Sequence, residues 1–167
     1  DVTKSTSLKT IAEKIEENHG QISYWFNNAG VAGLGAFDEL SEKDFSKVIG
    51  INLFGVVNGT RVALNHMSKN GFGTIINIAS VAGLLPAPMM SAYNASKHGV
   101  VGFTRSISLE LKLKKSPVKI VNVCPGFVET ALINKGESLG FPEWLSFMLS
   151  TPETVVREID RGLRKGS

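Results

Sequence analysis

Two side chains suited to proton transfer lie four residues apart in the stretch SAYNASKHGVVG: the phenol of Tyr93 and the ammonium of Lys97. On a helix, residues at this spacing share one face. A free tyrosine has a pKa near ~10, and a nearby ammonium lowers that pKa because it favours the phenolate. A tyrosine tuned in this way can exchange a proton with an alcohol or carbonyl oxygen. By itself, however, the spacing more often marks a solvated surface pair.

The neighbouring motifs favour a catalytic interpretation. Ser80 lies thirteen positions before Tyr93, just after a predicted strand, and open α/β sheets bind ligands beyond the carboxyl ends of their strands. Small residues follow two other predicted strands, at Asn27–Gly30 and Pro125–Gly126, where they let a flat ligand approach the backbone. Asn52 interrupts a predicted helix and is a mediocre helix former, which indicates another role.

The elements that must position these residues alternate between helix and strand. Helices are predicted over residues 7–19, from Ser41 to about Lys69 with a break near Gly50, over 91–113, and from Pro152 onward with Thr151 as N-cap. Buried strands are predicted over 22–26, 74–79 and 118–124. Because these strands are almost wholly apolar, they are typical of a parallel sheet covered on both faces. The predicted fold class is therefore α/β: a three-layer, doubly wound, Rossmann-like parallel sheet.

The order of elements predicts a single partial domain over residues 1–167. The sequence begins with a helix and ends without a strand after its last helix. We therefore expect the first strands and the last strand of the sheet to be missing from it.

Composition excludes several classes of protein. Eighteen basic and fifteen acidic residues give a net charge of only +3, too little to indicate nucleic-acid binding. Prolines and polar residues interrupt the uncharged run 70–96, so no membrane span is predicted. The single cysteine, Cys124, forms no internal disulfide and suits a reducing compartment, and Asp1–Lys4 is too polar for a secretory signal. A cytoplasmic location is expected. His66 and His98 lack further ligands at metal spacing, so no metal site is predicted.

Together these pieces resemble the short-chain dehydrogenase/reductase family, in the family's order and at its spacings. The matching residues are Asp1-Val2, Asn27-Asn28-Ala29-Gly30, Asn52, Ser80, Tyr93-x-x-x-Lys97, Pro125-Gly126 and Thr130. The family's glycine-rich turn beneath the cofactor pyrophosphate has no counterpart. Gly30-x-x-Gly33-x-Gly35 follows a different strand and is predicted to be a flexible turn.

The resemblance implies a catalytic set of Asn52, Ser80, Tyr93 and Lys97. Tyr93 would be the acid/base on the substrate oxygen, and Ser80 would hydrogen-bond that oxygen. Lys97 would lower the tyrosine pKa and hold the nicotinamide ribose. Asn52 would position a water that links Lys97 to solvent.

The resemblance also implies NAD or NADP as cofactor, without deciding between them, because the residue that selects one lies in the part without a counterpart. The implied cofactor contacts are Asp1, Val2, Asn28, Ala29, Gly30, Tyr93, Lys97, Pro125, Gly126, Val128 and Thr130. The implied substrate contacts are Ser80, Leu85, Met90 and Tyr93. Residues 131–150 would form a lid over the substrate; ordinary core packing is an equal alternative.

The predicted activity is an NAD(P)-dependent interconversion of a secondary alcohol with a ketone or aldehyde. Apolar residues in the lid and before Tyr93 indicate an apolar small-molecule substrate, and the runs SKHGVVGFTRS and CPGFVETAL resemble the hydroxyprostaglandin dehydrogenase branch. The alternative is a non-catalytic cofactor-binding or scaffold member of the same fold. Epimerases and dehydratases share Tyr-x-x-x-Lys but differ around the first strand and the serine.

The resemblance further implies a homodimer or homotetramer, paired through two of the helices. Small apolar residues are predicted at outer positions of those helices: Gly55, Val57, Gly59, Ala63, Gly99 and Val100.

Overall fold

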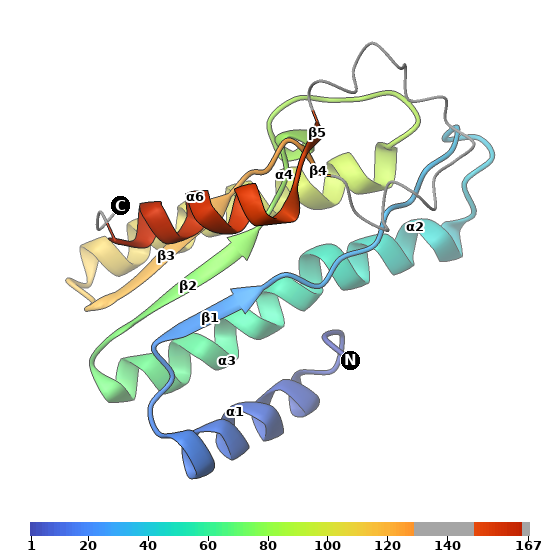
Figure 1. Ribbon diagram of the computed structural model, residues 1–167. Coiled ribbons are helices and arrows are strands. Elements are labelled where there is room, and N and C mark those ends of the chain that lie inside the picture. Colours follow the sequence, from blue (N-terminus) through green and yellow to red (C-terminus); the bar gives the residue numbers. More distant parts are fainter. Residues whose placement is uncertain (129–148, 165–167) are drawn as a thin grey trace.

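A computed structural model of the 167-residue protein describes residues 1–128 and 149–164. Its central element is a parallel sheet of three strands in the order β1-β2-β3, with helices on both sides (Figure 1). The strands are β1 (Tyr24–Asn27), β2 (Gly73–Ile78) and β3 (Val118–Val123). The long helices are α1 (Ser5–His19), α2 (Glu42–Ile49), α3 (Gly55–Asn70), α4 (Ser91–Leu113) and α6 (Pro152–Arg164). The predicted α/β fold class is confirmed.

The register of the sheet brings the strand ends together at one edge. Asn27 of β1 pairs with Asn77 of β2, which pairs with Asn122 of β3. The next residues along each strand lead into the loops that carry Asn28–Gly30, Ser80 and Pro125. All three segments named in the sequence therefore emerge at the same carboxyl edge, where open α/β sheets bind ligands.

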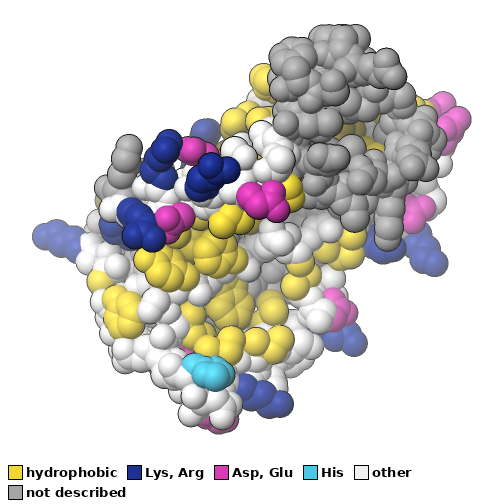
Figure 2. Space-filling model, viewed as in Figure 1, with side chains coloured by type: hydrophobic (Ala, Val, Ile, Leu, Met, Phe, Trp, Pro, Cys, Tyr) yellow, Lys and Arg dark blue, Asp and Glu magenta, His cyan; other side chains and the backbone are white. Residues whose placement is uncertain are grey.

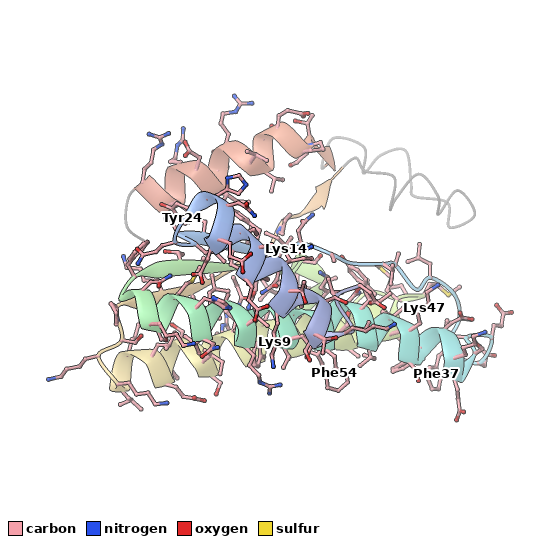
Figure 3. The ribbon with its side chains drawn as sticks, turned by 90° about the horizontal axis from the view of Figure 1, so that it is seen from below. Lys9, Lys14, Tyr24, Phe37, Lys47 and Phe54 are labelled. Atoms are coloured by element: carbon pink, nitrogen blue, oxygen red, sulfur yellow. The ribbon has the colours of Figure 1, made fainter. Side chains whose placement is uncertain are left out.

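Helices α3 and α4 cover one face of the sheet, and α6 lies on the other side (Figures 1 and 3). Helix α1 packs against α3. The apolar core between α1, α3 and the sheet is centred on fully buried Met67 and Ile75, with Leu111 of α4 at its margin. Among the described residues, no helix combines the length and the apolar character that a membrane span requires.

Strand β1 differs from its prediction. It runs from Tyr24 to Asn27 rather than from Ile22 to Phe26, and it is not buried on both faces. Tyr24 is 53% exposed and Phe26 is 49% exposed, whereas Trp25 and Asn27 are half-buried, so one face of β1 is open and the other is covered. The two exposed aromatic residues line an apolar groove with Ile11 and Ile15 of α1; apolar side chains gather on this face in Figure 2, and Tyr24 is labelled in Figure 3.

The break predicted near Gly50 is a change in helix type. Residues Gly50–Phe54 form a π-helix, η1, that joins α2 directly to α3. A π-helical turn is rare and often marks a functional site. The predicted start at Ser41 is confirmed, since its hydroxyl oxygen accepts a hydrogen bond from the Asp44 amide at 3.1 Å.

The predicted outer positions of α3 and α4 are wrong for four residues. Gly55, Gly59, Ala63 and Val100 are buried inside the protein, because α3 and α4 turn their small residues toward the sheet and toward neighbouring segments. The large apolar side chains that are exposed nearby are Phe54, Leu109 and Leu113, and Phe54 points away from the body of the protein in Figure 3.

Buried amides tie the strands to the helices that cover them. The side-chain Nδ2 of Asn27 donates to the side-chain Oδ1 of Asn77 at 2.8 Å and to the Thr60 hydroxyl of α3 at 3.2 Å. The Asn77 amide in turn donates to the Thr104 hydroxyl of α4 at 2.8 Å. Gly59 of α3 has to be a glycine here, since a Cβ would overlap the Asn27 carboxamide. This network fixes how both helices sit on the sheet.

After β3 the chain forms a short strand, β4 (Phe127–Val128), which pairs in parallel with β5 (Leu149–Ser150). This two-stranded sheet was not predicted. The predicted lid over 131–150 lies outside the described residues except for its last two. The predicted start of α6 is confirmed: Pro152 is its first residue, and the Thr154 amide donates to the Thr151 hydroxyl at 3.3 Å.

Candidate active site

The four residues named as catalytic come together at the carboxyl edge of the sheet. Ser80 follows β2 after one intervening residue and caps the short 3-10 helix η2 (Val81–Gly83), its hydroxyl accepting from the Ala82 amide at 3.1 Å. Tyr93 and Lys97 lie on α4, and both are buried. The Ser80 side chain lies near the Tyr93 hydroxyl and lowers its pKa. Asn52 lies in η1 and is completely buried.

Lys97 is a buried ammonium, with only 5% of its surface exposed. Its Nζ donates to the carbonyl oxygen of Ile78, the last residue of β2, at 2.8 Å. It also lies 5.6 Å from the centre of the Tyr93 ring, within the range of a cation–π contact. Burial lowers the pKa of Lys97 to about 8, and the Cys124 thiol opposes that shift.

The pKa of Tyr93 moves in the direction opposite to the prediction. Burial raises it above its ordinary value, and the hydrogen bond with Ser80 only partly counteracts this. The physical reason is that the phenol is removed from water, which disfavours the phenolate, while the Lys97 ammonium donates to a backbone carbonyl instead. At neutral pH Tyr93 is therefore a protonated hydroxyl.

Asn52 binds the loop that follows β1. Its Oδ1 accepts from the Val31 amide at 2.8 Å, and its Nδ2 donates to the Val31 carbonyl at 2.9 Å. This pair of contacts fixes the residue that comes immediately after Gly30. The water relay expected of Asn52 stays a prediction.

The Gly30 backbone lies beside two of the catalytic groups. A Cβ at this position would lie 3.4 Å from Asn52 Oδ1 and 3.9 Å from Lys97 Nζ, so any side chain would enter the space in front of them. Asn28, Ala29 and Gly30 are all exposed. Gly30 therefore presents backbone without a side chain next to a buried ammonium.

The remaining predicted cofactor contacts differ in how they are held. Asp1 accepts from the amide and hydroxyl of Thr3 at 2.9 and 2.7 Å. Val2 lies against Gly55, where a Cβ would approach it to 2.7 Å, and its carbonyl accepts from the Asn58 amide at 3.1 Å. Helix α3 thus holds the Asp1–Val2 backbone near η1.

At the end of β3, the Pro125 carbonyl accepts from the Val81 amide at 2.9 Å, which joins this segment to the one after Ser80. Gly126 is exposed. Val128 lies in β4, and Thr130 lies outside the described residues. No cluster of three or more histidine, cysteine or acidic residues that would hold a metal occurs within residues 1–128 and 149–164.

The predicted substrate side is a loop between Ser80 and α4. Leu85 is 69% exposed and Met90 is half-buried. The Met89 backbone has a φ of 61°, an uncommon conformation for a residue with a side chain. The Met89 carbonyl accepts from the Gly35 amide at 2.9 Å, so this loop and the loop after β1 meet.

Comparison with known proteins places this geometry in a family. The sequence profile described as short chain dehydrogenase matches residues 1–138. The chain belongs to the short chain dehydrogenase family. The predicted family is confirmed, and with it the partial Rossmann-like fold.

Several family members are closely similar in sequence or structure. Human 15-hydroxyprostaglandin dehydrogenase (NAD+) is 42% identical over 146 residues, which cover 84% of this chain and 52% of that protein. D-beta-hydroxybutyrate dehydrogenase of Rhizobium meliloti is 33% identical over 159 residues, covering 95% of this chain and 59% of that protein. A short chain dehydrogenase/reductase from Burkholderia phymatum, solved in complex with NAD, has a TM-score of 0.77 at 37% identity, covering 87% of this chain and 51% of its own. The chain thus spans just over half the length of these relatives.

Two buried polar residues of this family member were not singled out from the sequence. Asn94 holds the substrate-side loop, with its Nδ2 donating to the carbonyls of Ala82 at 2.8 Å and Leu85 at 3.1 Å. Ser96 bonds to Asn52. Both are polar residues between Tyr93 and Lys97, close to the two proposed catalytic side chains on the same helix, and that is the signal that could have identified them.

Proposed function

We propose that the protein is an NAD(P)-dependent oxidoreductase that interconverts a secondary alcohol with a ketone or aldehyde. The observation that carries this proposal is the grouping of Ser80, Tyr93 and Lys97 at one edge of the sheet, with the buried Lys97 ammonium 5.6 Å from the centre of the Tyr93 ring. Two hydrogen-bonding hydroxyls can hold one substrate oxygen between them. A neighbouring cation favours negative charge that develops on that oxygen.

In the direction of reduction, Tyr93 donates its phenolic proton to the carbonyl oxygen as that oxygen becomes an alcohol. Ser80 donates a hydrogen bond to the same oxygen. Lys97 stabilises the phenolate that remains on Tyr93 after proton transfer. In the direction of oxidation the same proton returns to Tyr93 from the alcohol. Burial keeps Tyr93 protonated at neutral pH. The rate of reduction, which needs the protonated phenol, should therefore be higher at neutral pH, and the rate of oxidation should be higher at alkaline pH.

The residues around Gly30 suit a nicotinamide cofactor. The space that a Cβ at Gly30 would enter lies between Asn52 and Lys97, and a flat ligand can approach the bare backbone there. Lys97 would bind the ribose of the cofactor. The other proposed contacts come from the loops after β1 and β3 and from the start of the chain: Asn28, Ala29, Gly30, Pro125, Gly126, Asp1, Val2, Val128 and Thr130. The cofactor, when bound, supplies or accepts the hydride at the substrate carbon. We favour NAD over NADP, since one relative is named for NAD+ and another was solved with NAD.

We further propose an apolar substrate. Leu84, Leu85 and Met89 are exposed in the loop between Ser80 and Tyr93, and exposed apolar side chains beside a catalytic group are typical of a lipophilic pocket. The similarity to 15-hydroxyprostaglandin dehydrogenase supports the same class, whereas that to D-beta-hydroxybutyrate dehydrogenase supports a small hydroxy acid. A screen with the full-length protein compares lipophilic secondary alcohols with small charged hydroxy acids. Clear preference for the hydroxy acids would refute the apolar substrate.

Substitution of Tyr93 tests the mechanism. Tyr93→Phe removes the hydroxyl and should abolish turnover of the full-length protein while the fold is retained, as judged by circular dichroism. The sequence has one other tyrosine, Tyr24. It is half exposed, lies at the start of β1 and is not one of the proposed catalytic residues. Tyr24→Phe is the matched control and should keep activity. Activity retained in Tyr93→Phe contradicts the mechanism.

A homodimer or homotetramer in the cytoplasm completes the proposal. Exposed Phe54, Leu109 and Leu113 on η1 and α4 support self-association, since exposed large apolar groups often mark contact surfaces. Sedimentation of the full-length protein as a monomer would contradict the oligomer, and fractionation of its source cells tests the location.

A further inference from the structure

Ser96 has a buried hydroxyl that lies between two parts of the site. Its side chain is completely buried, three residues after Tyr93 on α4. The hydroxyl donates to the Tyr93 carbonyl oxygen at 2.7 Å. The same hydroxyl oxygen accepts from Asn52 Nδ2 at 3.1 Å. Serine is a mediocre residue for a helix interior because its hydroxyl competes for backbone groups, so helix formation does not explain its presence.

The two bonds of Ser96 complete a chain of contacts through the site. Asn52 uses one N–H of its amide for the Val31 carbonyl and the other for Ser96, while its Oδ1 accepts from the Val31 amide. A flipped carboxamide would set N–H against N–H and oxygen against oxygen, so the Asn52 orientation is fixed. The chain runs from the loop after β1, through η1, to the backbone of Tyr93.

We propose that Ser96 is a positioning residue that holds the Tyr93 backbone at a fixed place relative to Asn52 and Val31. It touches no reacting atom. Its effect on turnover rests on the function proposed above, because the position of the Tyr93 hydroxyl affects the rate only if Tyr93 transfers the proton in the reaction. Its effect on the Asn52–Val31 contact does not depend on that function.

The competing explanation is that position 96 only needs a small side chain. Helix α4 and η1 approach closely near this point, since a Cβ on Gly99 would lie 3.0 Å from Leu53. Alanine would satisfy that need as well as serine does. Ser96→Ala therefore separates the two explanations: it keeps the small size and removes both hydrogen bonds.

The test uses the full-length protein and two measurements. In Ser96→Ala, kcat should fall roughly tenfold with KM for the alcohol within about twofold, because an interaction that orients Tyr93 in the transition state is lost. Hydrogen exchange at the Val31 amide should become roughly tenfold faster, as expected when one hydrogen bond that fixes its acceptor is removed. Ser96→Thr keeps the hydroxyl, which can still bond the carbonyl three residues earlier, and should restore both values.

Ser106→Ala provides the matched control, because Ser106 is an exposed serine on the same helix, and it should change neither measurement. Unchanged kcat and unchanged Val31 exchange in Ser96→Ala would overturn the proposal. Failure of the proposed function is distinguishable. It would appear as activity retained in Tyr93→Phe, while Val31 exchange would still report on Ser96.

Discussion

Replacing Lys97 by methionine should make the protein more stable while it removes activity. The ammonium is buried, and its removal from water lowers its pKa from 10.5 to about 8. Methionine has a similar length and no charge, so it can fill the same space without the free-energy cost of removing a charge from water. The protein would then lose the cation that supports Tyr93 in the proposed mechanism.

The size of this change in stability follows from the protonation of Lys97 in the folded and in the unfolded protein. A tenfold change in an equilibrium is worth about 1.4 kcal/mol, so burying the Lys97 ammonium costs about 3 kcal/mol at pH 7, by linkage between protonation and folding. The unfolded chain binds this proton more tightly than the folded one, so the cost falls as pH rises from about 8 toward 10.5 and is about 2 kcal/mol at pH 9. Methionine leaves the Ile78 carbonyl without its partner, which costs about 1–2 kcal/mol. The expected net gain is therefore about 1–2 kcal/mol at pH 7 and about 1 kcal/mol less at pH 9.

Equilibrium unfolding in urea at the two pH values measures these quantities on the full-length protein. Lys112 is an exposed lysine on the same helix, and Lys112→Met should change stability by less than about 0.5 kcal/mol. The decisive result is the difference between Lys97→Met and the wild type at each pH. A variant that is less stable than the wild type by the same amount at both pH values would refute the reasoning, since burial of the charge would then not be the source of the cost.

Three further substitutions test the polar contacts of the fold, each by urea unfolding. Gly59→Ala should destabilise by about 1–3 kcal/mol because its Cβ overlaps a buried carboxamide, whereas Gly102→Ala, on an open helix surface, should stabilise by about 0.5–1 kcal/mol; equal effects would contradict the close contact. Thr104→Val keeps the shape but leaves the Asn77 amide without its acceptor, at a cost of about 1–3 kcal/mol; a neutral result would mean that the amide finds another partner. The pKa of Glu16 is lowered by hydrogen bonds from a histidine and an asparagine of α3, so its contribution is present at neutral pH and is lost as pH falls through the lowered pKa. Glu16→Gln should therefore lower the free energy of unfolding by less at pH 3 than at pH 7. An equal loss at both pH values would contradict the hydrogen bonds of the Glu16 carboxylate with α3.

The helices and the catalytic positions could be predicted because local patterns determine them. The spacing of Tyr93 and Lys97 and the cap at Ser41 depend on residues within one or two turns, and α4 has the bounds that the sequence predicts. That Ser80 lies near Tyr93 and Lys97 could be predicted from one further rule, that parallel strands end at the same edge of a sheet.

The exposure of β1 and the pKa of Tyr93 could not be predicted, because both depend on what lies next to a residue in space. An apolar run such as ISYWF is compatible with burial on one face or on two, and only the segments that cover each face of β1 in space decide between them. Likewise the ammonium of Lys97 was expected to act on the Tyr93 hydroxyl. It donates to Ile78 instead, so desolvation of the phenol dominates.

The buried polar groups serve three purposes that experiments can separate. Asn77 and Thr104 join strand to helix and touch none of the proposed catalytic groups, so their loss should lower stability and leave kcat per folded molecule unchanged. Lys97 is held at a cost to stability, so its loss should raise stability and remove turnover, as functional sites often require. Ser96 belongs to neither class: its two bonds join Asn52 to the backbone of Tyr93, so its loss should lower kcat more than stability. The three kinds of residue thus predict three different pairs of changes in stability and kcat, and no single defect in folding can produce all three.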